Sequence, residues 1–396
     1  MPIPTPFHPR TSVLCESQEW RPWSGYLAAA TYEPSHEHEY YAIRNAAALI
    51  DVSPLFKYEI RGPDAGRLLN RVMTRDVTRC AVGQVMYSPW CDDDGKVIDD
   101  GTLSRLAPDR FRLTAADPNL VWLQDAGYGL QATVEDVSAG LAALAVQGPR
   151  ARDVLAQALA GVDLSSLKYY HLAHARLGEV PLTVTRTGYT GDLGYELWLA
   201  PEHASRLWDR LMECGEGYGI TPAGMVALDL ARIEAGLLLI EVDYISARKA
   251  LIPDQKSSPF DLGLDWAVHL EKPGFIGRRA LLQEKASGSR WRWVGFEVEW
   301  DSLESLYAAV DLAPRLAGRA SRSPVPVYRD GRQVGQVTSH TFSPLLKKYI
   351  GLGTVVREQA RLGDTVQMEF TIEYARHNAR ARLVKPQFFN PPRKRA

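Results

Sequence analysis

Cysteine is scarce in this 396-residue sequence, and long apolar runs are missing. The four cysteines are scattered, with no CxxC pair and no zinc-like spacing, which predicts reduced thiols. No run approaches the roughly 20 apolar residues of a membrane span, and the first ten residues contain no apolar signal region. We therefore expect a cytoplasmic protein with no membrane partner.

An excess of one charge is also absent, because 46 Lys and Arg residues balance 47 Asp and Glu residues. No global field then favours nucleic acid, so a charged ligand needs a local site. Hydrophobic residues make up 45% and charged residues 23%, which is typical of a folded globular chain. The length predicts two or three domains.

Several familiar sites are missing from the sequence. It contains no GxxxxGK[ST] phosphate loop, GxGxxG fingerprint, GxSxG elbow or HExxH pair. His36 and His38 would share one face of a strand but not of a helix. With no third ligand in view, we expect no metal site.

The periodicity predicts α+β packing over the first two thirds of the chain. Residues 1–38 look irregular, and a buried helix is expected from Pro222 to about Leu239. After Trp293 the spacing of short strands predicts a small β-barrel or sandwich, with a helical or irregular insertion at 301–322. The other expected elements are helices at 39–48, after Asp64, at 118–125 and at 150–159, and strands at 56–60, 84–90, 96–105, 110–115, 131–136, 145–149 and 181–186.

The first informative stretch runs from Val85 to Gly101. Asp92–Asp94 and Gly95 form a hairpin turn, where such residues satisfy backbone groups and accept unusual dihedrals. Asp99 and Asp100 instead lie within the returning strand, so they point to opposite faces. One of them should face a core or a pocket, and a buried carboxylate needs partners. The strand pattern leaves both a structural hydrogen bond and a ligand contact open.

The second stretch runs from Thr185 to Leu197 and carries a glycine at every third position. Such a loop lets the backbone approach a ligand closely. Tyr189 and Tyr195 offer flat surfaces, and Glu196 a carboxylate that could accept two hydrogen bonds from the amino-pyrimidine edge of a pterin. A Gly-rich turn with exposed tyrosines is the alternative.

Taken in chain order, these stretches resemble the aminomethyltransferase (glycine-cleavage T-protein) family over roughly residues 39–386. The most specific matches are the Asp-Asp strand and Arg186-Thr187-Gly188-Tyr189-Thr190-Gly191. The other matching segments are Ile50–Ser53, Arg61–Ala65, Tyr87–Ser88, Val146–Pro149, Gly194–Glu196, Arg232–Gly236, Pro259–Leu264, Phe275–Gly277 and Gly335–Ser339.

The resemblance implies a three-domain α+β cloverleaf around a central folate channel, with tetrahydrofolate as cofactor. Two interleaved folate-binding subdomains are expected within residues 1–280, a C-terminal β-barrel domain within 281–390, and a solvated basic tail at 391–396.

The site residues follow from the same resemblance. Asp100 matches the catalytic aspartate beside the folate nitrogens, and Glu196 the glutamate that anchors the pterin. Tyr87 matches a tyrosine that lines the folate channel. Tyr189 and Arg232 are also expected to bind the cofactor.

The sequence departs from the glycine-cleavage pattern at three places. Pro54 replaces a histidine, and Leu228 replaces an arginine, which removes a bidentate donor. The segment 241–250 looks more similar to tetrahydrofolate-dependent demethylases, whose aryl-ether members have a tyrosine at the position of Tyr244 near the departing oxygen. Trp90 and Leu228 would shape an apolar substrate pocket.

These departures favour a demethylase that moves a methyl group from a small O-, N- or S-methylated substrate to N5 of tetrahydrofolate, as a monomer or homodimer. Asp100 would orient the cofactor and accept the N5 proton, and Tyr244 would donate to the leaving group. Two alternatives stay open: glycine-cleavage aminomethyl transfer from a lipoylated carrier protein, and a non-catalytic folate-binding protein on the same fold.

Overall fold

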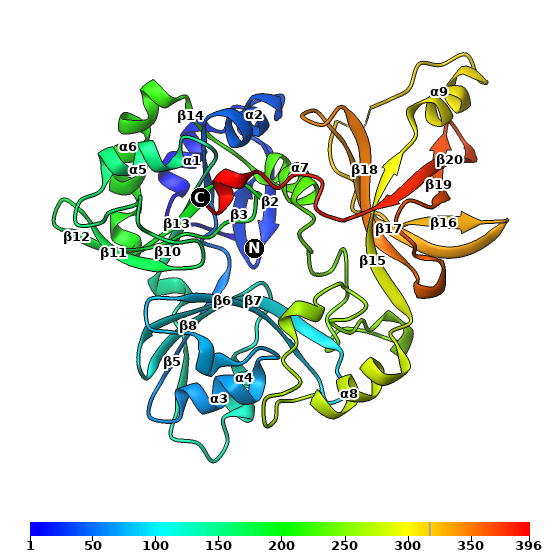
Figure 1. Cartoon of the computed structure of the whole chain (residues 1–396). Coiled ribbons are helices and arrows are strands. Elements are labelled where there is room, and N and C mark those ends of the chain that lie inside the picture. The colour runs from blue at the N-terminus through cyan, green and yellow to red at the C-terminus, as the bar shows by residue number, and fades with distance from the viewer. Residues whose placement is uncertain (317) are drawn as a thin grey trace. The chain divides into compact units, whose positions relative to one another are not determined.

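The computed structural model describes residues 1–316 and 318–396, and it divides into two compact units (Figure 1). Unit 1 consists of Met1–Trp90, Asp99–Ala231 and Asn390–Ala396, and unit 2 of Cys91–Ile98 and Arg232–Phe389. The chain therefore passes from one unit to the other four times. The domain limits expected at residues 280 and 390 stay predictions.

A five-stranded sheet in unit 1 carries the Asp-Asp strand. Its strands in spatial order are β6 (Val85–Cys91), β7 (Val97–Ala107), β8 (Arg110–Ala115), β5 (Phe56–Arg61) and β9 (Thr133–Asp136). Helix α3 (Ala65–Val72) packs on α4 (Leu120–Ala126), and α4 packs on β9. Alternate residues of the sheet, such as Ile60 and Phe111, are fully buried cross-strand partners. Glu59 and Arg112, the neighbouring cross-strand pair, point to the opposite face.

A six-stranded sheet forms the second layer of unit 1. Its strands in spatial order are β11 (Leu172–Leu177), β12 (Val180–Thr185), β13 (Gly194–Leu199), β10 (Ala142–Gln147), β4 (Ala47–Asp51) and β14 (Ile220–Pro222). Tyr195, Leu197 and Leu199 of β13 join a hydrophobic core with α5 (Ala151–Ala158) and α6 (Ala204–Gly215). Because side chains alternate along a strand, Glu196 and Trp198 lie on the other face.

The N-terminal segment is regular, and the irregular structure expected for residues 1–38 is wrong. It forms a three-stranded sheet of β1 (Ile3–Pro4), β3 (Tyr26–Ala29) and β2 (Trp20–Trp23), with α1 (His8–Leu14). Phe7 and Cys15 at the two ends of α1 are fully buried in the same core as α6. Helix α2 (Glu37–Asn45) follows and ends two residues before β4 begins.

Unit 2 is built on a closed barrel, which decides between the two β architectures expected for this region. Its strands in spatial order are β15 (Trp291–Val298), β18 (Lys348–Val356), β17 (Arg332–Ser343), β16 (Val325–Arg329), β19 (Thr365–Ile372) and β20 (Ala375–Val384). Helix α9 (Trp300–Ala308) packs on β20 and occupies part of the expected insertion at 301–322, of which residue 317 lies outside the described residues. Mixed helix and sheet with a C-terminal barrel confirms the expected fold class.

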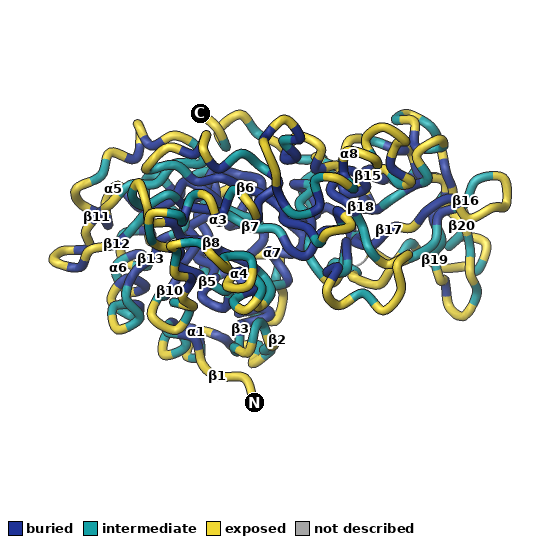
Figure 2. The backbone as a smooth tube through the Cα atoms, turned by 90° about the horizontal axis from the view of Figure 1, so that it is seen from below, coloured by how far each residue is buried: buried dark blue, intermediate teal, exposed yellow. Residues whose placement is uncertain are grey.

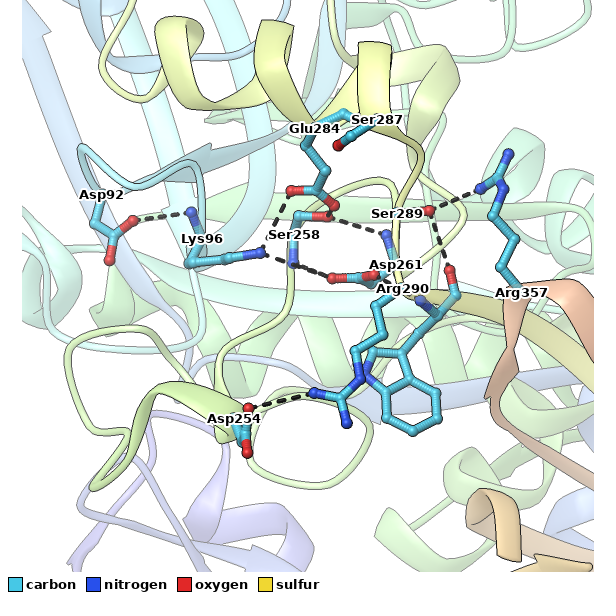
Figure 3. A network of polar contacts seen from close by, with 11 residues as sticks. Asp92, Lys96, Asp254, Ser258, Asp261, Glu284, Ser287, Ser289, Arg290 and Arg357 are labelled. Atoms are coloured by element: carbon cyan, nitrogen blue, oxygen red, sulfur yellow. Dashed lines mark hydrogen bonds and ion pairs between the residues drawn. The ribbon is translucent and has the colours of Figure 1, made fainter.

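The hairpin Cys91–Ile98 is anchored in unit 2 by the polar network of Figure 3. Lys96 Nζ lies 3.3 Å from Glu284 of α8 (Arg278–Ser287) and 4.0 Å from Asp261. Asp92 pairs with Lys256 at 3.0 Å, and the amide of Val97 donates to the carbonyl of Ser257 at 2.9 Å. The strand that continues into Asp99 and Asp100 therefore starts from a fixed turn.

Exposed residues gather at the N-terminus and at hairpin tips, whereas buried residues follow the strands (Figure 2). Within residues 1–316 and 318–396, none of the helices combines the length and apolar character needed to cross a membrane.

Candidate functional site

The two adjacent aspartates of β7 have different surroundings. Asp99 is fully buried and accepts hydrogen bonds from the amide of Asp117 (3.0 Å) and from Asn119 Nδ2 (2.9 Å). Burial, reinforced by the neighbouring carboxylate of Asp100, raises the pKa of Asp99 well above its usual range. One carboxylate of the pair thus faces the core with partners, as the strand pattern predicted.

Asp100 points to the opposite face of the sheet and is partly exposed. The phenol of Tyr87, on β6, donates a hydrogen bond to its carboxylate. Burial raises the pKa of Tyr87 well above its usual range, and the charge of Asp100 adds to this shift. Tyr170 and Tyr189 lie close enough to Tyr87 to affect it electrostatically. The structure thus brings together three of the expected residues, Tyr87, Asp100 and Tyr189.

Glu196 lies in the middle of β13 on the face opposite the hydrophobic core. Its Oε2 accepts from the hydroxyls of Thr187 at 2.7 Å and Thr185 at 3.4 Å, and Thr185 is also its cross-strand partner. Burial raises the pKa of Glu196, while these hydroxyls and the charge of Arg112 oppose the shift. Glu196 also acts electrostatically on Tyr170, which links it to the Tyr87–Asp100 pair.

Arg112 of β8 connects the two sheets of unit 1. Its guanidinium lies 4.3 Å from the ring centroid of Trp198 on β13, and only 5% of the residue is exposed. It attracts both Glu196 and Glu59. We call Tyr87, Asp100, Arg112, Tyr170 and Glu196 the intersheet cluster. All five belong to unit 1.

The glycines around Tyr189 make room for a neighbouring side chain. The sequence alone suggests instead that they let a ligand approach the backbone closely. The buried side chain of Gln147 fills the space beside Gly188 and Gly194, where an added Cβ would lie 2.0 and 2.1 Å from Gln147 Oε1. Thr190 donates to the same oxygen at 2.9 Å. Gln147 therefore fixes the loop, and Tyr189 is its partly exposed side chain next to Tyr87.

The basic tail is exposed at four of its six residues, as expected, but side-chain contacts hold it to the rest of unit 1. Arg393 forms a bidentate pair with Asp192 at 2.7 and 2.8 Å. Lys394 Nζ lies 5.7 Å from the ring centroid of Tyr169. The ring of Tyr169 packs in an edge-to-face arrangement against the ring of Tyr170, a member of the intersheet cluster. Composition alone does not reveal the carboxylate of Asp192, which lies 201 residues before Arg393 in the chain.

The remaining expected residues lie outside this cluster in the contacts described. Trp90 is fully buried at the end of β6, and Leu228 is 6% exposed on α7 (Met225–Ala235). Tyr244 belongs to unit 2 and is 3% exposed. Arg232, also in unit 2, is fully buried and pairs with Asp243 at 2.6 Å. The cofactor role of Arg232 stays a prediction.

Sequence reasoning missed Arg112 and Tyr170. Arg112 alternates with Phe111 and Leu113 in the strand Arg-Phe-Arg-Leu-Thr-Ala, which places a buried cation on the polar face of a central strand. Such a position is a signal, because a charge in the middle of a sheet needs a partner or a ligand. Tyr170 follows Tyr169 in a segment without periodicity, and nothing local distinguishes it.

The intersheet cluster can bind a flat, nitrogen-rich ring. Glu196 presents a carboxylate whose two hydrogen bonds within the described chain both go to Oε2, so Oε1 can accept from a ligand. Tyr87 and Tyr170 supply aromatic surface, and Asp100 a carboxylate that can hold a proton. Across the residues described, no group of three or more His, Cys, Asp or Glu side chains could hold a metal ion.

Comparison with known proteins found two family models that match the chain. The GCVT N-terminal domain matches residues 10–272, and the glycine cleavage T-protein C-terminal barrel domain matches residues 310–390. Aminomethyltransferase of Desulfitobacterium hafniense (strain DSM 10664 / DCB-2) is 35% identical over 83% of this chain and 84% of its own length. Aminomethyltransferase of Moorella thermoacetica is 34% identical over 94% of both chains. The crystal structure of glycine cleavage system aminomethyltransferase T from Bartonella henselae matches with a TM-score of 0.81 at 24% identity, over 98% of this chain and 99% of that one, which supports the fold.

Proposed function

The chain belongs to the glycine-cleavage T-protein (aminomethyltransferase) family, and on that premise we propose that it transfers an aminomethyl-derived one-carbon unit from a lipoylated carrier protein to tetrahydrofolate. Tetrahydrofolate is the acceptor that this family uses. The membership confirms the resemblance drawn from the sequence, and with it a folate-dependent one-carbon transferase.

The observation that carries the proposal is the convergence of Asp100 and Glu196 on one cluster within unit 1. Glu196, held by two threonine hydroxyls, would accept hydrogen bonds from the amino-pyrimidine edge of the pterin. Asp100, oriented by the phenol of Tyr87, would accept the proton released on the acceptor side. When bound, tetrahydrofolate supplies the nucleophilic nitrogen. Positioning by these side chains accounts for much of the rate under this proposal.

The choice of donor rests on the relatives. Those described above are named aminomethyltransferase, and two of them align over 83% and 94% of this chain. Aminomethyl transfer, the alternative weighed from the sequence, therefore has better support than the demethylation favoured there.

Two observations, on Leu228 and Tyr244, favour demethylation of a small methyl donor as a second candidate. Leu228 is a buried apolar residue where the glycine-cleavage enzymes carry an arginine, and Tyr244 is buried in a segment that resembles demethylases. If Tyr244 donates a proton to the leaving group, Tyr244→Phe should lower demethylation about 100-fold or more. Turnover of a methyl donor by Tyr244→Phe at the wild-type rate would remove this residue from the mechanism.

One assay with two arms tests the proposal. The protein is incubated with tetrahydrofolate and either an aminomethylated lipoyl carrier protein or a panel of aryl methyl ethers, betaines, methylated amino acids and sulfonium compounds, with mass-spectrometric detection of the folate product. Ammonia and methylene-tetrahydrofolate from the carrier arm would support aminomethyl transfer. 5-Methyltetrahydrofolate from the panel arm alone would overturn it in favour of demethylation.

A further inference from the structure

Arg112 is a buried cation whose donors are not satisfied by the protein. Its Nε and Nη2 are inaccessible to solvent, and neither forms a hydrogen bond to any residue in 1–316 or 318–396. A buried donor without an acceptor costs about 1–3 kcal/mol, and more when the group is charged. A ligand that brings an acceptor would recover this cost.

The nearby carboxylates do not provide that acceptor. Glu59, its cross-strand neighbour, is held by Arg61 at 2.5 Å and by Arg110 at 2.7 Å. Glu196 is held by the threonine hydroxyls and attracts Arg112 without a hydrogen bond to it among the described contacts. Trp198 covers one face of the guanidinium and offers no acceptor to its N–H groups.

Arg112 and Glu196 attract each other and carry hydrogen-bonding groups of opposite kinds. Glu196 accepts, and the edge of the guanidinium donates. The pyrimidine edge of a pterin carries the complementary groups: a carbonyl oxygen at C4, an N–H at N3 and an amino group at C2. A carboxylate suits the last two groups and a guanidinium the first.

We infer that Arg112 is a ligand-binding residue that donates to the C4 carbonyl oxygen of the pterin beside Glu196, and that it makes the site specific for 4-oxo over 4-amino pteridines. This inference rests on the proposed use of folate and adds a contact and a specificity to it. A site built to hydrogen-bond an oxygen rejects an analogue that presents a donor instead, because two buried donors then face each other.

Folic acid and aminopterin test the inference, because aminopterin has an amino group in place of the C4 oxygen and, as a consequence, no hydrogen at N3. Their dissociation constants are measured by calorimetry for the wild-type protein, Arg112→Met and Arg112→Lys, with thermal melting as a check on folding. Arg112→Met keeps an unbranched apolar side chain without donors, and Arg112→Lys keeps the charge on a compact ammonium that lacks the planar fork of donors. Arg67→Met is the control, since it removes a positive charge from the exposed face of α3 in unit 1, where the described contacts pair Arg67 with Asp64 and not with Glu59 or Glu196.

Arg112→Met should weaken folic acid about tenfold or more while aminopterin changes less than about twofold. Arg112→Lys should fall between, and it carries the test if Arg112→Met does not fold. Arg67→Met should leave the ratio of the two dissociation constants unchanged. Equal weakening of both ligands would overturn the inference. Arg112 would then affect binding only by its attraction to Glu196 and not by a hydrogen bond to the group at C4. A wild-type protein that binds neither ligand would overturn the proposed function itself.

Discussion

Asp99 and Asp100 are chemically identical neighbours whose substitutions should have different effects. Asp100→Asn keeps the shape of the side chain and removes the proton acceptor, so the rate of one-carbon transfer should fall about 100-fold or more, with folic acid binding retained. Steady-state kinetics of the donor that reacts, together with calorimetric binding, would measure both quantities.

Asp99→Asn is the control for this experiment. The carboxylate of Asp99 accepts three hydrogen bonds, and the substitution replaces one of its oxygens by an NH2 group that cannot accept. The melting temperature should therefore fall. Full turnover by Asp100→Asn would show that the carboxylate is dispensable and that the role given to Asp100 is wrong.

Arg232 should act through stability. Its guanidinium forms a buried pair with Asp243 and donates to Ser339 Oγ at 2.7 Å. Arg232→Met leaves Asp243 buried without its cation, so the free energy of unfolding should fall by about 3–5 kcal/mol in denaturant titration. The double variant Arg232→Met with Asp243→Asn should recover part of this loss. A stable Arg232→Met protein with abolished folic acid binding would instead support the cofactor role expected from the sequence.

Sequence patterns were informative for residues whose roles depend on their own strand. Alternation along β7 predicted that one aspartate of the pair is buried, and Asp99 confirms this. Arg112 could not be assigned in the same way, because its contact with Trp198 joins strands of two sheets. Asp64, the residue before α3, is of a type that often caps helices, but among the described contacts its carboxylate accepts from the amide of Gln131 and makes no hydrogen bond that caps α3.

At the scale of elements, the loop before β13 depends on the fit of Gln147 between two glycines. Gly188→Ala places a Cβ against the Gln147 amide, so the free energy of unfolding should fall by about 1–3 kcal/mol. Combining it with Gln147→Ala removes the obstacle and should recover part of the loss, in a double-mutant cycle followed by chemical denaturation.

Gly140→Ala is the matched control, because an added Cβ there meets no atom within 4 Å. Its effect should stay within about 0.5 kcal/mol. Equal stability of Gly188→Ala and Gly140→Ala would show that the Gln147 side chain moves away freely.

The elements recovered from the sequence are those with bulky apolar alternation, such as β5 and β8. Strand β20 was missed because its buried positions are Ala379, Ala381 and Leu383 between exposed arginines, and alanine gives a weak strand signal. Pro222 was expected in the first turn of α7 but ends β14, which pairs at the edge of the six-stranded sheet. Proline is tolerated there because an edge strand has a side without ladder bonds.

For the whole molecule, His340 in the barrel should make stability depend on pH. Burial lowers its pKa from 6.5 to about 4, and its Nδ1 lies 2.8 Å from the hydroxyl of Tyr349. As the pH falls from 6.5 to 4, the imidazole of His340 is protonated in the unfolded chain before it is protonated in the folded chain. The free energy of unfolding should therefore fall over that interval, by up to about 3 kcal/mol. Thermal melting between pH 7 and pH 4 would measure the loss.

Replacement of His340 by asparagine should flatten this part of the pH profile, whereas replacement of the exposed His174 of β11 should not. The buried carboxylates Asp51 and Glu39 act in the opposite direction, since their raised pKa values let the folded chain bind protons first. The comparison of the two histidine variants separates these contributions. Identical slopes for the two variants would contradict the assignment to His340.

The four passages of the chain between its units have a consequence for recombination. The chain begins and ends in unit 1. The eight residues 91–98 of unit 2 are encoded between two segments that belong to unit 1. No single crossover between two genes of this family can therefore exchange one unit whole. A chimaera joined at one point between residues 98 and 284 would inherit the hairpin from one parent and Glu284 from the other, so Lys96 and Glu284 would have to be compatible across parents. Relatives that recombine successfully should keep this pair together or change it together.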